Sequence, residues 1–368
     1  MQKIHFLGNK KRVFTRHYHP IHAFKNELLN AGISCKFYSN PLTPGIEECD
    51  VLVFFDASYR DILPIKSKER QAALDFLSGY LENFERVIWF DDRDSAGNLR
   101  TYIFPLVDKY AKSQLLSDIS YYQKQKKFGV LHRDFVYENY QIDDEINLKG
   151  PFYKGPLSQN DLSKLCLGWN LSLINWAYHG ENNILKRKLI SKRNRNYNIK
   201  FSYPDLCKRS IDISYRVNMW NNLPTVGWWR KTTYDYLEKY KKKHPDIKMN
   251  SYGYFNKKQY MHEMQNAIIS PSPFGFGEIC YRDFESFVNG ALLLKPDMGH
   301  LQTWPDFYED GRTFVAHKWD FSDFEEKLEN ILYNPKMFEP IAHEGQNKLH
   351  EAFTYGEKFV DQLLCLIS

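Results

Sequence analysis

Apolar strand-like runs alternate with amphipathic segments twice along this chain of 368 residues, and this alternation limits the possible folds more than any other feature. Residues 50–55 (DVLVFF) and 86–90 (RVIWF) are almost wholly apolar, which is typical of parallel strands covered on both faces. Residues 20–31 and 72–84 carry apolar side chains at helical spacing. The alternation predicts an α/β fold in which a parallel sheet lies between helices.

The second half of the chain repeats this organisation. We expect two Rossmann-like domains that face each other across a cleft, with boundaries at 1–160 and 161–350, and a final helix at 351–368 that packs back towards the first domain. Residues 161–179 are expected to be helical or core. Further strands are expected at 3–7, 35–38, 210–215, 248–254, 268–271 and 291–295, and further helices at 231–243, 256–267, 281–289, 321–332 and 338–364. The 321–332 helix is expected to open with a capping box, Ser322-x-x-Glu325.

Charge and cysteine content exclude several classes of protein. Lys and Arg number 50 against 45 Asp and Glu, so the net charge of +5 is too small to indicate a nucleic-acid-binding protein, and nucleic acid is not expected as a partner. The basic runs 186–195 and 239–244 are expected to be solvated faces. Six cysteines without a C-x-x-C pair argue against zinc and for reduced thiols. We expect a cytoplasmic protein without a signal peptide or membrane span, which is compatible with peripheral association at the inner face of a membrane.

The most informative motif is residues 270–290, SPSPFGFGEICYRDFESFVNG. A strand ends, a glycine-rich loop (residues 273–278) follows, and a helix begins, which places backbone N–H groups and a positive helix end beside the loop. Gly275 and Gly277, on either side of Phe276, allow a phosphate to approach the backbone closely. Arg282 and Glu285 lie on one helix face, where they could grip a nucleotide diphosphate or simply pair with each other.

The residues Arg282-x-x-Glu285, followed by 290–293 (GALL), resemble the carboxyl-terminal domain of glycosyltransferases with the GT-B fold. The chain is similar to group-1 glycosyltransferase domains of the spore-maturation type and, more distantly, to exostosin-like domains. The similarity continues through 308–315, 323–328, 334–335 and 341–345, and covers about 209–354. It implies a nucleotide-sugar donor in the second domain and an acceptor in the first.

The resemblance also implies roles for single residues. Glu285 would bind the donor ribose, Arg282 would lie near the pyrophosphate, and the loop 274–278 would border the transferred sugar. Many retaining members carry two glutamates eight positions apart, but here Gly277 stands eight positions before Glu285 and Glu278 only seven. Glu278 is therefore a weaker catalytic candidate, and the stereochemistry stays open.

Four further cations are candidate donor contacts: Arg216, Arg230, Lys231 and Lys295. Arg216 follows an expected strand and Lys295 ends one. Arg230-Lys231 begins an expected helix, where a basic helix surface is the favoured interpretation of this pair. The resemblance implies that such cations, rather than a metal, neutralise the leaving diphosphate. We therefore expect no cofactor beyond the nucleotide-diphosphate sugar as co-substrate.

The first domain should supply a base if the reaction inverts configuration. The preferred candidates are Asp92 and Asp94, with His17, His19 and Asp56 behind them, because all follow expected strands and so point to the cleft.

The expected activity is sugar transfer to a glycan or a lipid-linked saccharide in surface-polysaccharide or glycoconjugate synthesis. Two alternatives remain: Asp92-Arg93-Asp94 could be the metal-binding Asp-x-Asp of another glycosyltransferase class, or the protein could bind nucleotides or glycans without catalysis.

Overall fold

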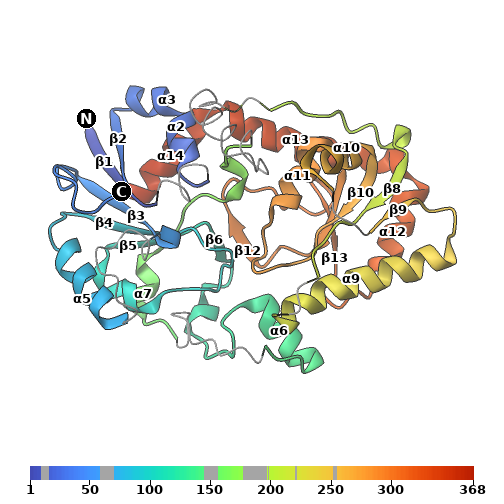
Figure 1. Ribbon diagram of the computed structural model, residues 1–368, viewed down its shortest axis with the longest axis horizontal. Helices are drawn as coiled ribbons and strands as arrows, with labels where there is room; N and C mark the ends of the chain where they lie inside the picture. The colour runs from blue at the N-terminus through green and yellow to red at the C-terminus, as the bar shows by residue number, and fades with distance from the viewer. Residues whose placement is uncertain are drawn as a thin grey trace.

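The computed structural model describes residues 1–9, 16–58, 70–144, 156–176, 197, 199–219, 222–251 and 255–368. Two parallel sheets lie side by side, each with helices packed around it (Figure 1). The first has the strand order β2-β1-β3-β4-β5-β7, and the second has the order β13-β11-β10-β8-β9. The basic run 186–195 lies outside the described residues, and so do residues 252–254 of the strand expected at 248–254.

The first sheet is built around its most apolar strands. Every residue of β3 (Val51–Phe55) and β4 (Val87–Asp91) is buried, so the two expected apolar strands are confirmed. Its other strands are β1 (Gln2–Leu7), β2 (Ile33–Tyr38), β5 (Lys109–Lys112) and β7 (Leu165–Leu167), and the helices packed around it include α2 (His19–Ala23), α3 (Lys25–Asn30), α5 (Arg70–Leu81) and α7 (Gln159–Lys164).

Two expectations for this domain differ from the structure. The helix expected at 20–31 is broken at Phe24, whose φ of −103° and ψ of 30° leave the helical region. The segment 161–179 is not one helix, because Leu165–Leu167 pairs with β5 as the edge strand of the sheet. The first sheet therefore extends beyond residue 160.

The glycine-rich loop follows a strand of the second sheet, β10. Its strands are β8 (Ile211–Ser214), β9 (Met249–Asn250), β10 (Ala267–Pro271), β11 (Leu292–Pro296) and β13 (Val315–His317), and its helices include α9 (Pro224–Lys243), α10 (Lys257–Asn266), α11 (Tyr281–Asn289), α12 (Phe324–Tyr333) and α13 (Pro335–Thr354). The helix expected at 281–289 is confirmed, and Gly290 ends it with a φ of 66°. A Cβ there would lie 2.6 Å from the Ser202 carbonyl oxygen, so only glycine fits.

The expected capping box at Ser322 is wrong. Helix α12 begins at Phe324 with Asp323 as the N-cap, and the Ser322 amide instead donates to the Asp320 carboxylate at 2.9 Å. Asn256 does cap α10, in a reciprocal box with Gln259.

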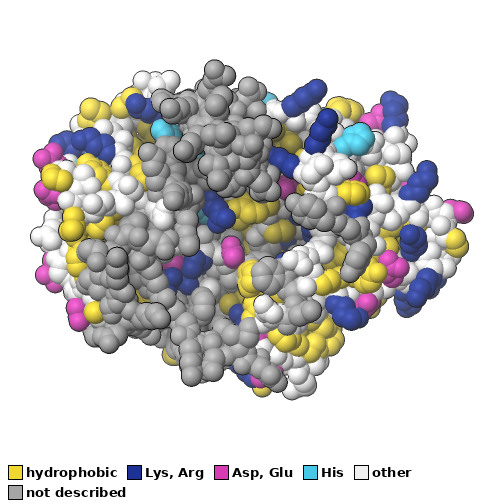
Figure 2. All heavy atoms as spheres, in the orientation of Figure 1, with side chains coloured by type: hydrophobic (Ala, Val, Ile, Leu, Met, Phe, Trp, Pro, Cys, Tyr) yellow, Lys and Arg dark blue, Asp and Glu magenta, His cyan; other side chains and the backbone are white. Residues whose placement is uncertain are grey.

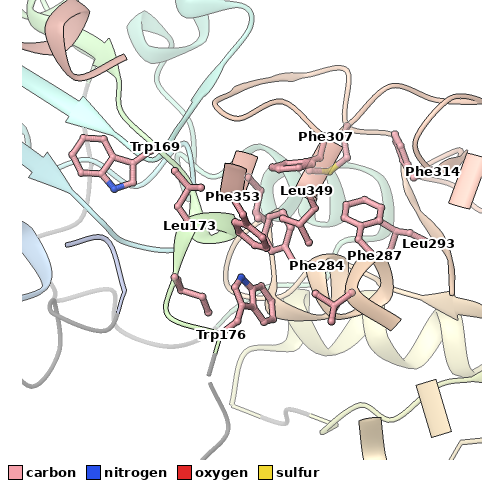
Figure 3. Close-up of a cluster of buried hydrophobic side chains, with 14 of the residues drawn as sticks. Trp169, Leu173, Trp176, Phe284, Phe287, Leu293, Phe307, Phe314, Leu349 and Phe353 are labelled. Carbon is pink, nitrogen blue, oxygen red and sulfur yellow. The ribbon is translucent and has the colours of Figure 1, made fainter. Parts of the chain in front are cut away.

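Within the described residues, several contacts join the two domains, and three of them involve whole helices or strands (Figure 1). Strand β6 (Gln114–Leu116) pairs antiparallel with β12 (Leu301–Thr303), α6 (Leu131–Tyr140) packs against α9, and α14 (Gly356–Ile367) packs against α3. One hydrophobic cluster runs through both domains, and Figure 3 shows part of it between Trp169 and Phe314. Among the described helices, none combines the length and the hydropathy that a transmembrane segment requires.

Candidate active site

The carboxyl end of the second sheet carries Arg282 and Glu285, as the sequence indicates. Strand β10 ends at Pro271, the glycine-rich loop follows, and α11 begins at Tyr281. Arg282 Nη2 donates to the carbonyl oxygen of Arg216, which lies just beyond the end of β8. The Tyr260 hydroxyl donates to Glu285 Oε2 at 2.9 Å and holds that carboxylate in place.

Arg230 joins Arg282 at this loop, and we call these two residues the basic cluster. A Cβ on Gly275 would lie 3.1 Å from Arg230 Nη2, so the loop backbone runs close to the guanidinium. Burial and the positive charge of Arg282 lower the pKa of Arg230. Two partly buried guanidinium groups that repel each other form a favourable site for a multiply charged anion.

Three other expected donor contacts are engaged elsewhere. Arg216 is partly buried and pairs with Glu263 at 2.8 Å, although its carbonyl oxygen orients Arg282. Lys231 is exposed and pairs with Asp235 one turn further along α9. Lys295 is fully buried and lies 3.3 Å from Asp283, so its charge is neutralised inside the domain. The structure does not bring Lys231 or Lys295 to the basic cluster, which corrects these two expectations.

The carboxyl ends of β1, β3 and β4 bring His17, Ala57 and Asp92 together in the first domain. Asp92 Oδ1 accepts from the Ala57 amide at 2.8 Å, and Asp92 Oδ2 lies 3.7 Å from His17 Nδ1. Burial, with the negative charges of Asp56 and Asp91, raises the pKa of Asp92 to about 7. Burial and Arg16 lower the pKa of His17 to about 3, and neither ring nitrogen has a hydrogen-bond partner among the described residues. A carboxyl that titrates near neutrality beside a neutral imidazole is suited to proton transfer.

The neighbouring charges of this run form a buried network. Arg93 lies 2.7 Å from Asp56 and 3.0 Å from Asp91, and Lys112 lies 3.0 Å from Asp91. Asp56 also pairs with Arg100, so it is a structural residue here. His19, the remaining candidate, packs against the ring of Tyr197.

The Asp-x-Asp interpretation places a metal at this network. The described residues contain no group of three His, Cys, Asp or Glu side chains that could hold a metal ion. Arg93, the middle residue of the tripeptide, turns inward to Asp56 and Asp91.

The glycine-rich loop meets the segment that follows Asp92, and we call this contact the seam. A Cβ on Gly277 would lie 1.7 Å from the carbonyl oxygen of Asp94, so the two backbones touch. Burial, together with the charges of Asp94 and Glu285, raises the pKa of Tyr281. This ring is therefore within electrostatic reach of carboxylates from both domains. Figure 2 shows charged side chains of both signs gathered near the middle of one face.

Glu278 and Phe276 occupy opposite environments in the loop. Phe276 is 42% exposed, whereas Glu278 is fully buried at the seam and bonded to Ser95, Ala96, Gln114 and His132. The Asp94 side chain reaches solvent, although the surrounding protein desolvates its carboxyl and raises the pKa. Sequence analysis missed Gln114 and His132, because neither belongs to a recognisable motif.

Comparisons with known proteins find similarity at the level of fold. No protein-family model matches the sequence, and no curated protein matches it. An alpha-glucosyltransferase in complex with UDP-glucose and DNA has 10% identity and a TM-score of 0.48, with 99% of each chain covered. HepE of Anabaena with UDP-glucose has 9% identity and a TM-score of 0.41, covering 99% of this chain and 100% of that one. An alpha1,3-fucosyltransferase has 13% identity and a TM-score of 0.42, covering 100% and 90%.

The exclusion of nucleic acid as a partner is wrong. Three of the similar structures contain an alpha-glucosyltransferase in complex with DNA. Those DNA molecules are partners of that protein.

The expected fold class is confirmed by the two parallel sheets and their helices. The similar structures include glycosyltransferases, and no relationship closer than fold is shown. The chain consists of two Rossmann-like domains, each a parallel sheet with helices packed around it.

Proposed function

We propose that this protein is a glycosyltransferase that moves a sugar from a nucleotide-diphosphate donor to a hydroxyl group of an acceptor. The observation that carries the proposal is the placement of two sites at one seam. The basic cluster lies on one side of the glycine-rich loop, and Asp92 precedes the segment that the loop contacts.

The donor would bind to the second domain. Arg230 and Arg282 would neutralise the diphosphate as negative charge develops on the leaving group. Glu285, held by Tyr260, would accept hydrogen bonds from the ribose hydroxyls. The proposal uses these cations and the backbone of the loop, with the nucleotide sugar as the only co-substrate.

The acceptor would bind to the first domain, where Asp92 would take the proton of the attacking hydroxyl. A base with a pKa near the working pH is the most effective, and the environment of Asp92 raises its pKa to about 7. The resemblance around Arg282 and Glu285 favours a glycan or a lipid-linked saccharide as acceptor, in surface-polysaccharide or glycoconjugate synthesis.

A thermal-shift panel of nucleotide sugars tests the donor site. A ligand at 100 times its dissociation constant stabilises a protein by about 2.7 kcal/mol, which raises Tm by several degrees. We expect this shift in the wild type and a loss of most of it in Glu285→Ala and Arg230→Ala. Lys231→Ala is the matched control, because Lys231 neighbours Arg230 on α9 but pairs with Asp235 in solvent.

Two results would contradict the proposal: no shift with any nucleotide sugar, or equal shifts in all four proteins. A transfer assay with and without a chelator distinguishes this proposal from the metal-dependent alternative. The proposal requires full activity in the presence of the chelator, whereas the alternative requires a loss of activity.

A further inference from the structure

We infer that Glu278 and His132 are positioning residues: they form a buried ion pair that holds the glycine-rich loop against the segment after Asp92 and so sets the distance between donor and acceptor base. This role rests on the proposed function. It differs from the sugar contact that sequence analysis expects for Glu278.

The carboxylate of Glu278 is bound almost entirely by the first half of the chain. It accepts from Ser95 Oγ at 3.2 Å, the Ala96 amide at 3.1 Å and Gln114 Nε2 at 3.0 Å, and it lies 3.3 Å from His132 Nδ1. Its side chain has no exposed surface. A glutamate of the second domain is therefore held by donors that belong to β6, α6 and the segment after β4.

His132 faces a hydrogen-bond acceptor at each ring nitrogen. Nδ1 meets the Glu278 carboxylate, and Nε2 lies 3.2 Å from the carbonyl oxygen of Gly275. A ring that carries a proton on both nitrogens would donate to both acceptors at once. Burial alone would raise the pKa of Glu278, but the hydrogen bond and charge of His132 and the charge of His300 lower it to about 2.

The two contacts of His132 bracket the loop. Gly275 and Glu278 are both fixed by the same ring, and Gly277 between them rests on the carbonyl oxygen of Asp94. Glu278 accepts hydrogen bonds from Ser95 and Ala96, which come three and four positions after Asp92. Because Gly275 also borders Arg230, one ion pair couples the basic cluster to the segment that carries the base.

Loss of this pair should affect geometry more than donor binding. Arg282 donates to the carbonyl oxygen of Arg216 and Glu285 accepts from Tyr260, and both partners belong to the second domain. Transfer, in contrast, requires the acceptor oxygen to be held close to the sugar carbon, and small displacements lower the rate strongly. A loosened seam also admits water, which competes with the acceptor for the activated sugar.

The test compares Glu278→Gln and His132→Gln with Asp144→Asn. Asp144 is the matched control, because its carboxylate is 4% exposed and also joins the domains, from Arg133 on α6 to Thr225 on α9, without touching the loop. For each protein we would measure nucleotide-sugar affinity by calorimetry, kcat of transfer, Tm, and the ratio of donor hydrolysis to transfer.

We expect both seam variants to lower kcat about tenfold or more and to raise the hydrolysis ratio, with donor Kd changed by less than about twofold. Asp144→Asn should lower Tm and leave the hydrolysis ratio unchanged. Gly277→Ala is a second probe, since its methyl group would separate the seam without altering any charge. It should raise the hydrolysis ratio in the same direction, and it keeps the test valid if a charge variant does not fold.

The inference is overturned if kcat falls only in proportion to the loss of Tm in the seam variants and in Asp144→Asn alike, while the ratio of donor hydrolysis to transfer is the same in all of them. It is also overturned if donor affinity, rather than kcat, falls. A wild-type protein that binds no nucleotide sugar would instead contradict the proposed function itself, and the positioning role with it.

Discussion

At the scale of single residues, two buried carboxyl groups show how the environment separates their roles. Asp92 accepts one hydrogen bond from a backbone N–H. Its burial and the negative charges of Asp56 and Asp91 raise its pKa to about 7. Glu278 is fully buried and accepts hydrogen bonds from Ser95 and Gln114, and His132 lowers its pKa to about 2. The first group is suited to exchange protons near neutral pH, and the second stays charged.

The pKa of Asp92 predicts a pH dependence of both catalysis and stability. The base acts when it is deprotonated, so kcat should rise with pH and level off above about 7. Because the folded pKa lies above the unfolded value of 3.8, the folded protein binds more protons between these values. The contribution of Asp92 to stability therefore falls as pH rises from about 4 to about 7.

Asp92→Asn tests both consequences. Transfer should fall by about 10²-fold or more, and donor affinity should persist. At pH 8 the variant should be more stable than the wild type by more than about 1 kcal/mol in urea denaturation, because it removes a buried charge. Asp94→Asn should keep the rising limb of kcat, since the Asp94 side chain reaches solvent. A rising limb that survives in Asp92→Asn would show that another group is the base.

At the scale of elements, caps depend on the few residues around them. Asn256 and Gln259 form a reciprocal capping box at the start of α10. The Ser322 motif has the same spacing, yet Asp323 occupies the N-cap position of α12 and accepts from the Lys318 amide at 2.8 Å. A capping motif thus predicts a helix start to within a residue or two, but the flanking chain decides which residue becomes the cap.

We therefore expect Asn256→Ala and Ser322→Ala to differ in stability. Asn256→Ala removes an acceptor for the Gln259 amide, and the free energy of unfolding should fall by about 1 kcal/mol. Ser322→Ala should change it by less than about 0.5 kcal/mol. Urea denaturation of the two variants measures these changes. An equal fall in the free energy of unfolding for both variants would mean that Ser322 does cap α12.

At the scale of the whole molecule, the two domains are held together by segments that leave their own half of the chain. The last helix, α14, packs against α3 (Figure 1). Gln362 of this helix donates to the carbonyl oxygen of Leu167 at 2.7 Å. The Arg86 guanidinium donates to the carbonyl oxygen of Ser368 at 2.6 Å. The helix α14 of the second half of the chain therefore packs against the first domain.

This arrangement predicts that a core substitution in α14 destabilises the whole chain. Leu363 is 0% exposed and Leu364 is 37% exposed on the same helix. Leu363→Ala should lower the free energy of unfolding by about 2–5 kcal/mol, whereas Leu364→Ala should change it by less than about 0.5 kcal/mol. Denaturation followed by tryptophan fluorescence provides the measurement. Similar small effects for both variants would show that α14 is not part of the core.

The sequence by itself indicated the central strands of both sheets, several helices and the helical turn that carries Arg282 and Glu285, because hydrophobic periodicity acts over a few neighbouring residues. It did not identify β7, because that short segment becomes a strand only by pairing with β5. Lys295 and Lys231 are equivalent candidates in the sequence, because both are lysines. Only the packing of the tertiary structure places Lys295 beside Asp283 in the core and Lys231 beside Asp235 in solvent. The bond between Glu278 and His132 joins residues 146 positions apart. No local pattern encodes such a contact, since it arises only when two separately patterned domains meet.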